Sequence, residues 1–149
     1  FAILGSGEKI YEDFFSEMHY RYPDRVGLTI GFVPELSKKI YAGADMFLMP
    51  SQSEPCGLAQ MIALRYGTIP IVRETGGLRD SIHDAGDKSG NGFTFKSYNA
   101  HDMLDAVVRA RAYYDDKMKW GRLVNTALKQ NFSWTKSAKD YIALYNDIH

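Results

Sequence analysis

The chain has 149 residues, of which 45% are hydrophobic and 24% are charged. That length suits one sizeable core and excludes two ordinary domains with a cleft between them. The 18 basic and 18 acidic residues give a formal net charge of zero, which argues against charge-driven binding to nucleic acid or to an anionic membrane. No apolar run approaches the roughly 20 residues that span a bilayer. We therefore expect a single domain over residues 1–149, with neither nucleic acid nor a membrane as partner.

Cys56 is the only cysteine. The sequence therefore excludes an internal disulfide framework and a cysteine-rich metal site, and it favours a reducing, cytoplasmic compartment. The chain opens directly on the apolar run 1–4, with neither an initiator methionine nor a basic leader. This start is not that of a signal peptide. We expect residues 1–149 to be part of a longer protein.

Short apolar runs alternate with helical patterns along the first two thirds of the chain. The runs are residues 1–4, 26–32, 46–49, 69–72 and 93–95. Such alternation is typical of parallel strands connected by helices. The sequence therefore predicts an α/β fold, with a Rossmann-like parallel sheet flanked by helices on both faces.

The segments between these runs carry helical patterns. Apolar residues at spacings of four predict a helix over 10–22, and proline at a first turn predicts a short one over 34–41. A further helix is expected from about 57 to 67, between glycines. The segment 84–92 is rich in glycine and aspartate, which predicts an exposed loop. From Asn99 onward the pattern is helical only, so the chain should end in several helices.

The turns after the strands carry the candidate functional residues, because ligands of open parallel sheets bind at the carboxyl ends of the strands. The first turn contains Gly5, Ser6 and Gly7. A Gly-x-Gly turn lets backbone amides approach a phosphate at a helix start. The dinucleotide fingerprint of dehydrogenases needs a third glycine, where this chain has Ile10. The alternative is a tight turn that needs positive φ.

The second turn is residues 50–60, PSQSEPCGLAQ. Glu54 is expected just beyond a strand end and ahead of a helix whose free amides attract an anion. A carboxylate beside such a helix start can hold both halves of a nucleotide sugar. It is equally open that Glu54 only caps the helix electrostatically. Cys56 is more often a small buried filler than a nucleophile, and no nearby histidine or lysine would activate its thiolate.

The third turn contains Thr75, Gly76 and Gly77, again directly after a strand. Paired glycines after threonine can form a concave nest of amides and a hydroxyl, which suits a diphosphate or sugar hydroxyls. The alternative is a plain strand-to-helix turn that needs two flexible residues.

Other chemistries lack their motifs. The histidines show no metal-ligand spacing; they are His19, His83, His101 and His149. The sequence has no G-x-S-x-G elbow and no Walker A loop. It also has no Asp-x-Asp pair to chelate a divalent metal on the phosphates. We therefore expect neither a metal nor another cofactor.

Residues 45–81 closely resemble the C-terminal domain of bacterial glycogen synthases and plant starch synthases. The resemblance rests on EPCGL at 54–58 with Gln60, and on RYGTIPIVRETGGLRD at 65–80. It extends to LGSG at 4–7, IGF at 30–32 and FSW at 132–134. It implies the C-terminal half of a two-domain GT-B glycosyltransferase. These enzymes transfer glucose, with retention, from ADP-glucose to the non-reducing end of an α-1,4-glucan.

The resemblance also implies roles for particular residues. Glu54 would be catalytic, with its carboxylate facing the donor glucose and the charge that develops at the anomeric carbon. The amides of Gly57 and Leu58 would bind the departing diphosphate. Pro55 and Cys56 would belong to the donor pocket, with Cys56 lining the glucose site.

Two further groups complete the implied donor site. Thr75, Gly76 and Gly77 would cradle the distal phosphate, and the turn 5–7 would contribute to nucleotide binding. Phe32 would stack on the adenine. Without the resemblance, Phe32 reads equally well as a core residue.

This sequence departs from the wider family pattern at several positions. Ile62 occupies the place of a second glutamate, which glycogen and starch synthases also lack. Gln52 and Ser53 stand where many members have an arginine and an aromatic residue. The family's phosphate-binding Arg and Lys and its glucan-binding N-terminal domain would precede Phe1. We therefore expect residues 1–149 alone to be inactive.

Two other functions remain open at this point. One is the nicotinamide-dinucleotide-binding half of a dehydrogenase, because of the Gly-x-Gly turn at 5–7. The other is a sensor that binds a nucleotide sugar without turnover. The preference for ADP over UDP rests on the resemblance alone.

Overall fold

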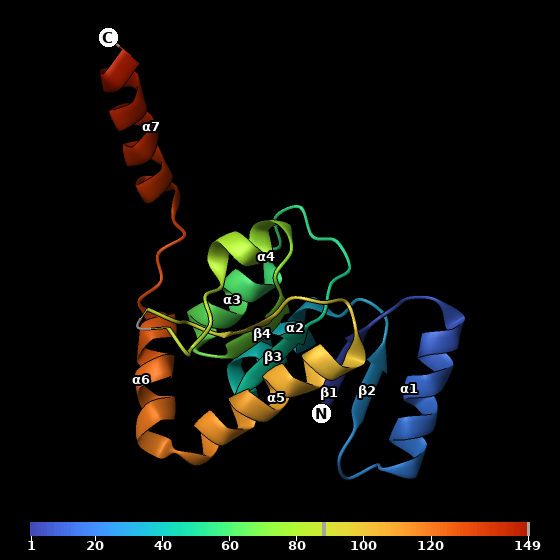
Figure 1. Ribbon diagram of the computed structural model, residues 1–149. Coiled ribbons are helices and arrows are strands. Elements are labelled where there is room, and N and C mark those ends of the chain that lie inside the picture. Colours follow the sequence, from blue (N-terminus) through green and yellow to red (C-terminus); the bar gives the residue numbers. More distant parts are fainter. Residues whose placement is uncertain (88, 149) are drawn as a thin grey trace. The chain divides into compact units, whose positions relative to one another are not determined.

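A computed structural model of the chain describes residues 1–87 and 89–148 (Figure 1). The elements of these residues, in chain order, are β1 (Ala2–Gly5), α1 (Lys9–Arg21), β2 (Gly27–Ile30), α2 (Pro34–Gly43), β3 (Met46–Met49), α3 (Ala59–Tyr66), β4 (Ile69–Arg73), α4 (Gly76–Ser81), β5 (Phe93–Phe95), α5 (Ala100–Asp115), α6 (Lys117–Leu128) and α7 (Trp134–Ile148). Each predicted apolar run coincides or overlaps with a strand, and the chain ends in helices as predicted.

The chain divides into two compact units, one over Phe1–Gly43 and one that begins at Ala44. In the first unit β1 and β2 pair in parallel. In the second, β3, β4 and β5 form a parallel sheet in that order. The predicted parallel pairing is confirmed, although the pairs form two sheets instead of one. Within each sheet, consecutive strands pair because the connection between them returns the chain to the start of the same sheet.

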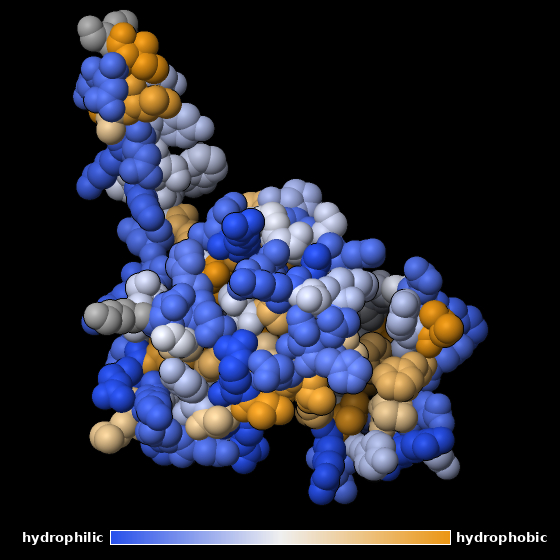
Figure 2. Space-filling view, viewed as in Figure 1, coloured by the Kyte–Doolittle hydropathy of each residue, from blue (hydrophilic) through white to orange (hydrophobic). Residues whose placement is uncertain are grey.

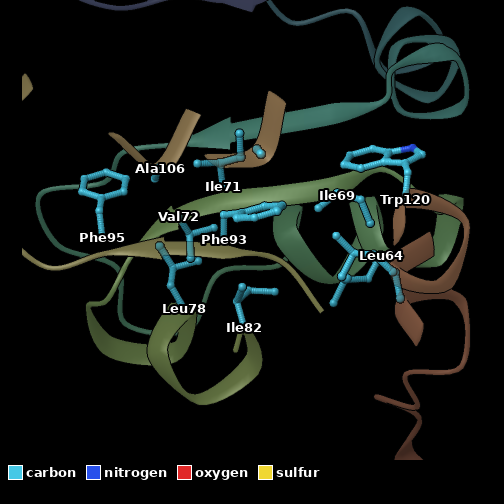
Figure 3. Close-up of a cluster of buried hydrophobic side chains, with 13 residues drawn as sticks. Leu64, Ile69, Ile71, Val72, Leu78, Ile82, Phe93, Phe95, Ala106 and Trp120 are labelled. Atoms are coloured by element: carbon cyan, nitrogen blue, oxygen red, sulfur yellow. The ribbon is translucent and has the colours of Figure 1, made fainter. Parts of the chain in front are cut away.

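The core of the second unit lies around β4, its central strand. Ile71, Val72 and Phe93 are buried between the neighbouring helices (Figure 3). The whole cluster comprises Leu64, Ile69, Ile71, Val72, Leu78, Ile82, Phe93, Phe95, Ala106, Ala110, Trp120, Leu123 and Ala127. A run of buried residues along β4 is expected for a strand with both faces covered. This core fixes the carboxyl ends of the strands, where the candidate site lies.

The first unit has no comparable core. None of residues 1–43 is buried, and the apolar face of α1 remains largely exposed, with Ile10 and Phe14 among its exposed side chains. A two-stranded sheet with two helices is too small to cover these side chains by itself.

Helix α3 shows how glycines set the bounds of an element. It begins at Ala59, two residues later than predicted, because Gly57 adopts φ +72° outside the helix. It ends as predicted at Gly67, whose φ of +78° is the left-handed conformation that closes many helices. Helix α4 was not predicted, because it starts on two glycines, which have poor helix propensity.

The segment 84–92 is only partly the exposed loop that was predicted. Asn91 is fully buried, and its side chain bonds to the Ser81 carbonyl and the His83 amide. Asp84 forms an isolated parallel bridge with Gly92. The prediction was wrong for this end of the segment, because Asn91 satisfies buried backbone groups that water would otherwise have to reach.

Helix α7 carries an apolar stripe without burying any of its residues. Figure 2 shows hydrophobic side chains beside hydrophilic ones along it. Throughout residues 1–87 and 89–148, no helix combines the length and the apolar character needed to cross a membrane.

Candidate functional site

Two turns leave the carboxyl edge of the three-stranded sheet next to each other. The first, residues 50–58, follows β3 and carries Glu54; we call it the Glu54 turn. The second, residues 74–77, follows β4 and leads into α4; we call it the Gly-Gly turn. Because Met49 is in register with Val72, both turns start at the same edge of the sheet. The structure thus brings together two of the predicted motifs.

The two turns touch through their backbones. The Gly77 amide donates a 3.2 Å hydrogen bond to the Glu54 carbonyl oxygen. A Cβ atom on Gly76 would overlap the same carbonyl oxygen, and one on Gly77 would overlap that of Cys56. The paired glycines therefore serve a close backbone approach, a role that the sequence analysis did not assign to them. Gly76 also has φ +44°, where side chains are strained.

This contact reduces the number of backbone amides that remain for the predicted phosphate cradle. The Gly77 amide is committed to Glu54, and the Thr75 amide donates to the Arg73 carbonyl oxygen at 2.8 Å. The Thr75 hydroxyl and the Gly76 amide are left as the donors of the proposed cradle. Phosphate binding by Thr75, Gly76 and Gly77 remains a prediction, with two of its three amides already engaged.

Glu54 itself is half-buried and lies five residues before the first residue of α3. Helix α3 has Leu58 at its N-cap and no side-chain hydrogen bond there, so Glu54 does not cap it through a hydrogen bond. The first-turn amides, which follow Gly57 and Leu58, keep the partial positive charge of a helix start.

Cys56 is exposed, so its interpretation as a buried filler was wrong. Pro55 is exposed as well.

Arg73, the last residue of β4, holds the beginning of the Glu54 turn. Its Nη1 donates to the carbonyl oxygens of Gln52 at 2.7 Å and Ser51 at 3.3 Å. The guanidinium also lies 5.6 Å from the ring centroid of Tyr98. Arg73 was not among the residues predicted for the site. A charged side chain at the end of an otherwise apolar strand was the signal that could have revealed it.

A polar network anchors the other side of the Gly-Gly turn. The Thr94 hydroxyl donates to the Glu74 carboxylate at 2.7 Å and contacts Asp84. Arg109 donates to both carboxylate oxygens of Asp84 at 3.0 and 2.8 Å and to the Thr94 carbonyl oxygen at 2.7 Å. Because Glu74 is the first residue of the Gly-Gly turn, this network connects the turn to α5.

The same contacts set the protonation of Asp84. Burial by itself would raise the pKa of its carboxyl group. Hydrogen bonds from Arg109 and from the amides of Thr94 and Gly86 outweigh burial and hold that pKa below its ordinary value. For Arg109, burial opposes the charged form, but the bonds to Asp84 and Asp105 raise its pKa. The pair therefore remains ionised at neutral pH.

In the first unit, the turn 5–7 and Phe32 lie at one edge of the β1–β2 sheet. The Gly31 amide donates to the Gly5 carbonyl oxygen at 2.9 Å, so the two strand ends are adjacent. Neither Gly5 nor Gly7 has positive φ, so the interpretation as a strained tight turn was wrong. The Gly7 amide is engaged by the Glu12 carboxylate at 2.9 Å. Ser6 is exposed between the two glycines.

Phe32 follows β2 and is 91% exposed. Its interpretation as a core residue of this chain was therefore wrong, and its face is accessible to a planar ring. Its stacking on adenine stays a prediction.

Within the described residues, no three His, Cys, Asp or Glu side chains are grouped so that they could hold a metal ion. Of the four histidines, His149 lies outside these residues.

Comparison with known proteins gives concordant matches. Residues 2–122 match the family described as glycosyl transferases group 1. The glycogen synthases of Anoxybacillus flavithermus (strain DSM 21510 / WK1) and Bacillus anthracis are 54% and 55% identical over 148 residues, 98% of this chain and 31% of each relative. The solved catalytic domain of starch synthase IV from Arabidopsis thaliana, bound to ADP and acarbose, superposes with a TM-score of 0.84 at 39% identity, covering 97% of this chain and 31% of that one.

The chain thus spans about a third of the length of these relatives. The match to starch synthase confirms the predicted Rossmann-like α/β architecture of a GT-B enzyme. Since the family match extends from β1 into α6 and includes both turns, the chain belongs to the glycosyl transferases group 1 family.

Proposed function

We propose that residues 1–149 are the donor-binding part of a longer retaining glucosyltransferase of the glycogen synthase class. The reaction is transfer of glucose from ADP-glucose to the non-reducing end of an α-1,4-glucan, which a further domain of the full-length protein would bind. The observation that carries this proposal is the contact between the Glu54 turn and the Gly-Gly turn. It is supported by the identity of 54% to a glycogen synthase over nearly the whole chain.

The geometry suits the chemistry of such a transfer. Retaining transfer passes through an oxocarbenium-like centre, which a nearby carboxylate stabilises. The departing diphosphate needs donors that are already oriented. Glu54 supplies the carboxylate, and the backbone amides of Gly57 and Leu58, directly before α3 begins, are the proposed donors to the diphosphate. The absence of an Asp-x-Asp motif supports transfer without a divalent metal.

The dehydrogenase alternative has no support in the family match or in the similar proteins. A direct measurement of glucose transfer distinguishes the proposed enzyme from a sensor that binds a nucleotide sugar without turnover. Binding of ADP-glucose in preference to UDP-glucose is part of the proposal, as is a cytoplasmic location.

The test is Glu54→Gln in the full-length protein, assayed with labelled ADP-glucose and glycogen. Loss of the charge should reduce kcat by at least about a hundredfold, because electrostatic stabilisation of the transition state is lost. ADP affinity should stay nearly unchanged. Glu17→Gln, which alters an exposed carboxylate paired with Arg21 on α1, is the matched control and should leave kcat unchanged. Near-normal turnover of Glu54→Gln would exclude the role proposed for Glu54.

A further inference from the structure

Gln60 is a fully buried polar residue in the first turn of α3. Its side-chain nitrogen Nε2 lies within hydrogen-bond distance of three oxygens. It donates to the carbonyl oxygens of Gly57 at 2.9 Å and Cys56 at 3.2 Å, and it contacts the Ser81 hydroxyl at 3.1 Å. Two of these partners belong to the Glu54 turn, and the third lies at the end of α4.

Ser81 extends the connection to the Gly-Gly turn. Its hydroxyl donates to the Gly77 carbonyl oxygen at 2.6 Å. The Gly77 amide in turn donates to the Glu54 carbonyl oxygen. A closed circuit of hydrogen bonds therefore runs from Gln60 through Ser81 and Gly77 to the Glu54 turn and back. Every step of this circuit lies in the second unit.

The chemistry of the position requires a donor. The carbonyl oxygens of Cys56 and Gly57 can only accept, so they fix the orientation of the Gln60 amide. Its other atom, Oε1, is buried and has no hydrogen-bond partner among the described residues. A Cβ atom on Gly57 would lie 2.5 Å from this oxygen. A buried, unpaired acceptor is unfavourable, so what this position contributes is its pair of N–H donors.

We infer that Gln60 is a positioning residue that holds the Glu54 turn and the Gly-Gly turn in a single arrangement. It keeps the Glu54 carboxylate at a fixed place relative to the donors that follow Gly57. The effect of Gln60 on the turns does not depend on the reaction. Its effect on turnover rests on the function proposed above.

The experiment compares Gln60→Glu and Gln60→Met with Gln130→Glu in the full-length protein. Gln130 is the matched control, because it belongs to neither turn and its Nε2 donates to one helical carbonyl oxygen, that of Thr126. The first readout is hydrogen exchange in the peptides covering 53–58 and 75–81, compared with wild type at each pH. At pH 8 both Gln60 variants should exchange about tenfold faster or more there, since several hydrogen bonds are lost.

The pH dependence distinguishes the donor from simple packing. A buried carboxyl group facing carbonyl oxygens has a raised pKa and donates one hydrogen bond when protonated. In Gln60→Glu the excess exchange should therefore shrink as the pH falls from 8 to 5. In Gln60→Met it should stay constant, and Gln130→Glu should resemble wild type throughout. Wild-type exchange in Gln60→Met, or no pH dependence in a folded Gln60→Glu, would overturn the inference.

Turnover separates this inference from the proposed function. If both hold, Gln60→Met lowers kcat about tenfold or more, while KM for ADP-glucose changes little, because positioning acts on the transition state. If wild type transfers glucose and Gln60→Met keeps normal kcat, the inference fails. If exchange responds as expected but wild type transfers no glucose, the proposed function fails and the positioning of the turns stands.

Discussion

The backbone amide of Gly77 donates a hydrogen bond to the carbonyl oxygen of Glu54. The two residues are far apart in the sequence, in turns that follow neighbouring strands. The contact makes the Glu54 turn and the Gly-Gly turn one structural element, so a change in either turn is transmitted to the other.

Gly77→Ala should destabilise the protein and displace the Glu54 turn. The added methyl group would overlap the backbone of Cys56, and overpacking of this kind costs about 1–3 kcal/mol. Urea denaturation of the full-length protein measures the loss. The control is Gly121→Ala within α6, where an added Cβ meets no atom within 4 Å. That variant should instead stabilise by about 0.5–1 kcal/mol, because alanine is the better helix former. A neutral Gly77→Ala would mean that the turns are not in backbone contact.

Arg73→Lys should impair turnover more than stability. A lysine side chain is shorter than an arginine side chain, and it lacks the planar guanidinium that reaches the carbonyl oxygens of Ser51 and Gln52. We expect kcat of the full-length protein to fall roughly tenfold, with KM for the donor nearly unchanged. Arg122→Lys, on the exposed side of α6, is the control. Equal kcat in the two variants would show that Arg73 does not position the Glu54 turn.

The elements of the fold were predictable from the sequence because strands and helices differ in apolar period. The run 69–72 is apolar on both faces, and it became the buried central strand β4. The turns with Glu54 and the Gly-Gly pair were also predictable, since strand ends are marked by proline and glycine. What these turns do to each other was not. The contact of Gly77 with Glu54 and the bonds of Gln60 depend on the pairing of β3 with β4, which no local pattern contains.

The same limit applies to the segment 84–92. Its composition indicated an exposed loop, yet Asp84 pairs with Arg109, a residue on α5. A pairing between residues this far apart follows from the packing of α5 on β5. No local sequence pattern around either residue predicts it.

Asp84→Asn should make the free energy of unfolding vary less with pH in the acid range. The Asp84 carboxyl group has a lowered pKa in the folded protein, so its contribution is present at neutral pH. That contribution is lost as the pH falls through the lowered pKa, below about pH 4. At pH 7 the variant should be less stable than wild type by about 1–3 kcal/mol. The difference should narrow between pH 4 and pH 2, as measured by urea denaturation.

The control for this measurement is Asp115→Asn, which removes an exposed pair with Arg111 on α5. Exposed pairs of this kind contribute at most about 1 kcal/mol. If the difference in free energy of unfolding between wild type and Asp84→Asn stayed constant with pH, the stabilising role of the Asp84 charge would be contradicted.

Phe32→Ala tests the predicted stacking of this ring on adenine. Because the ring is 91% exposed, its removal should change the free energy of unfolding by less than about 0.5 kcal/mol. Stacking of a base on an aromatic ring contributes about 1–3 kcal/mol, so ADP affinity of the full-length protein should fall about fivefold or more. Tyr20→Ala removes a similarly exposed ring from α1 and should leave affinity unchanged. Calorimetric titration with ADP and with UDP measures the affinities, and urea denaturation measures the free energy of unfolding. Equal ADP affinity in the two variants would place the adenine elsewhere, whereas a selective loss for Phe32→Ala would assign the ring to the base.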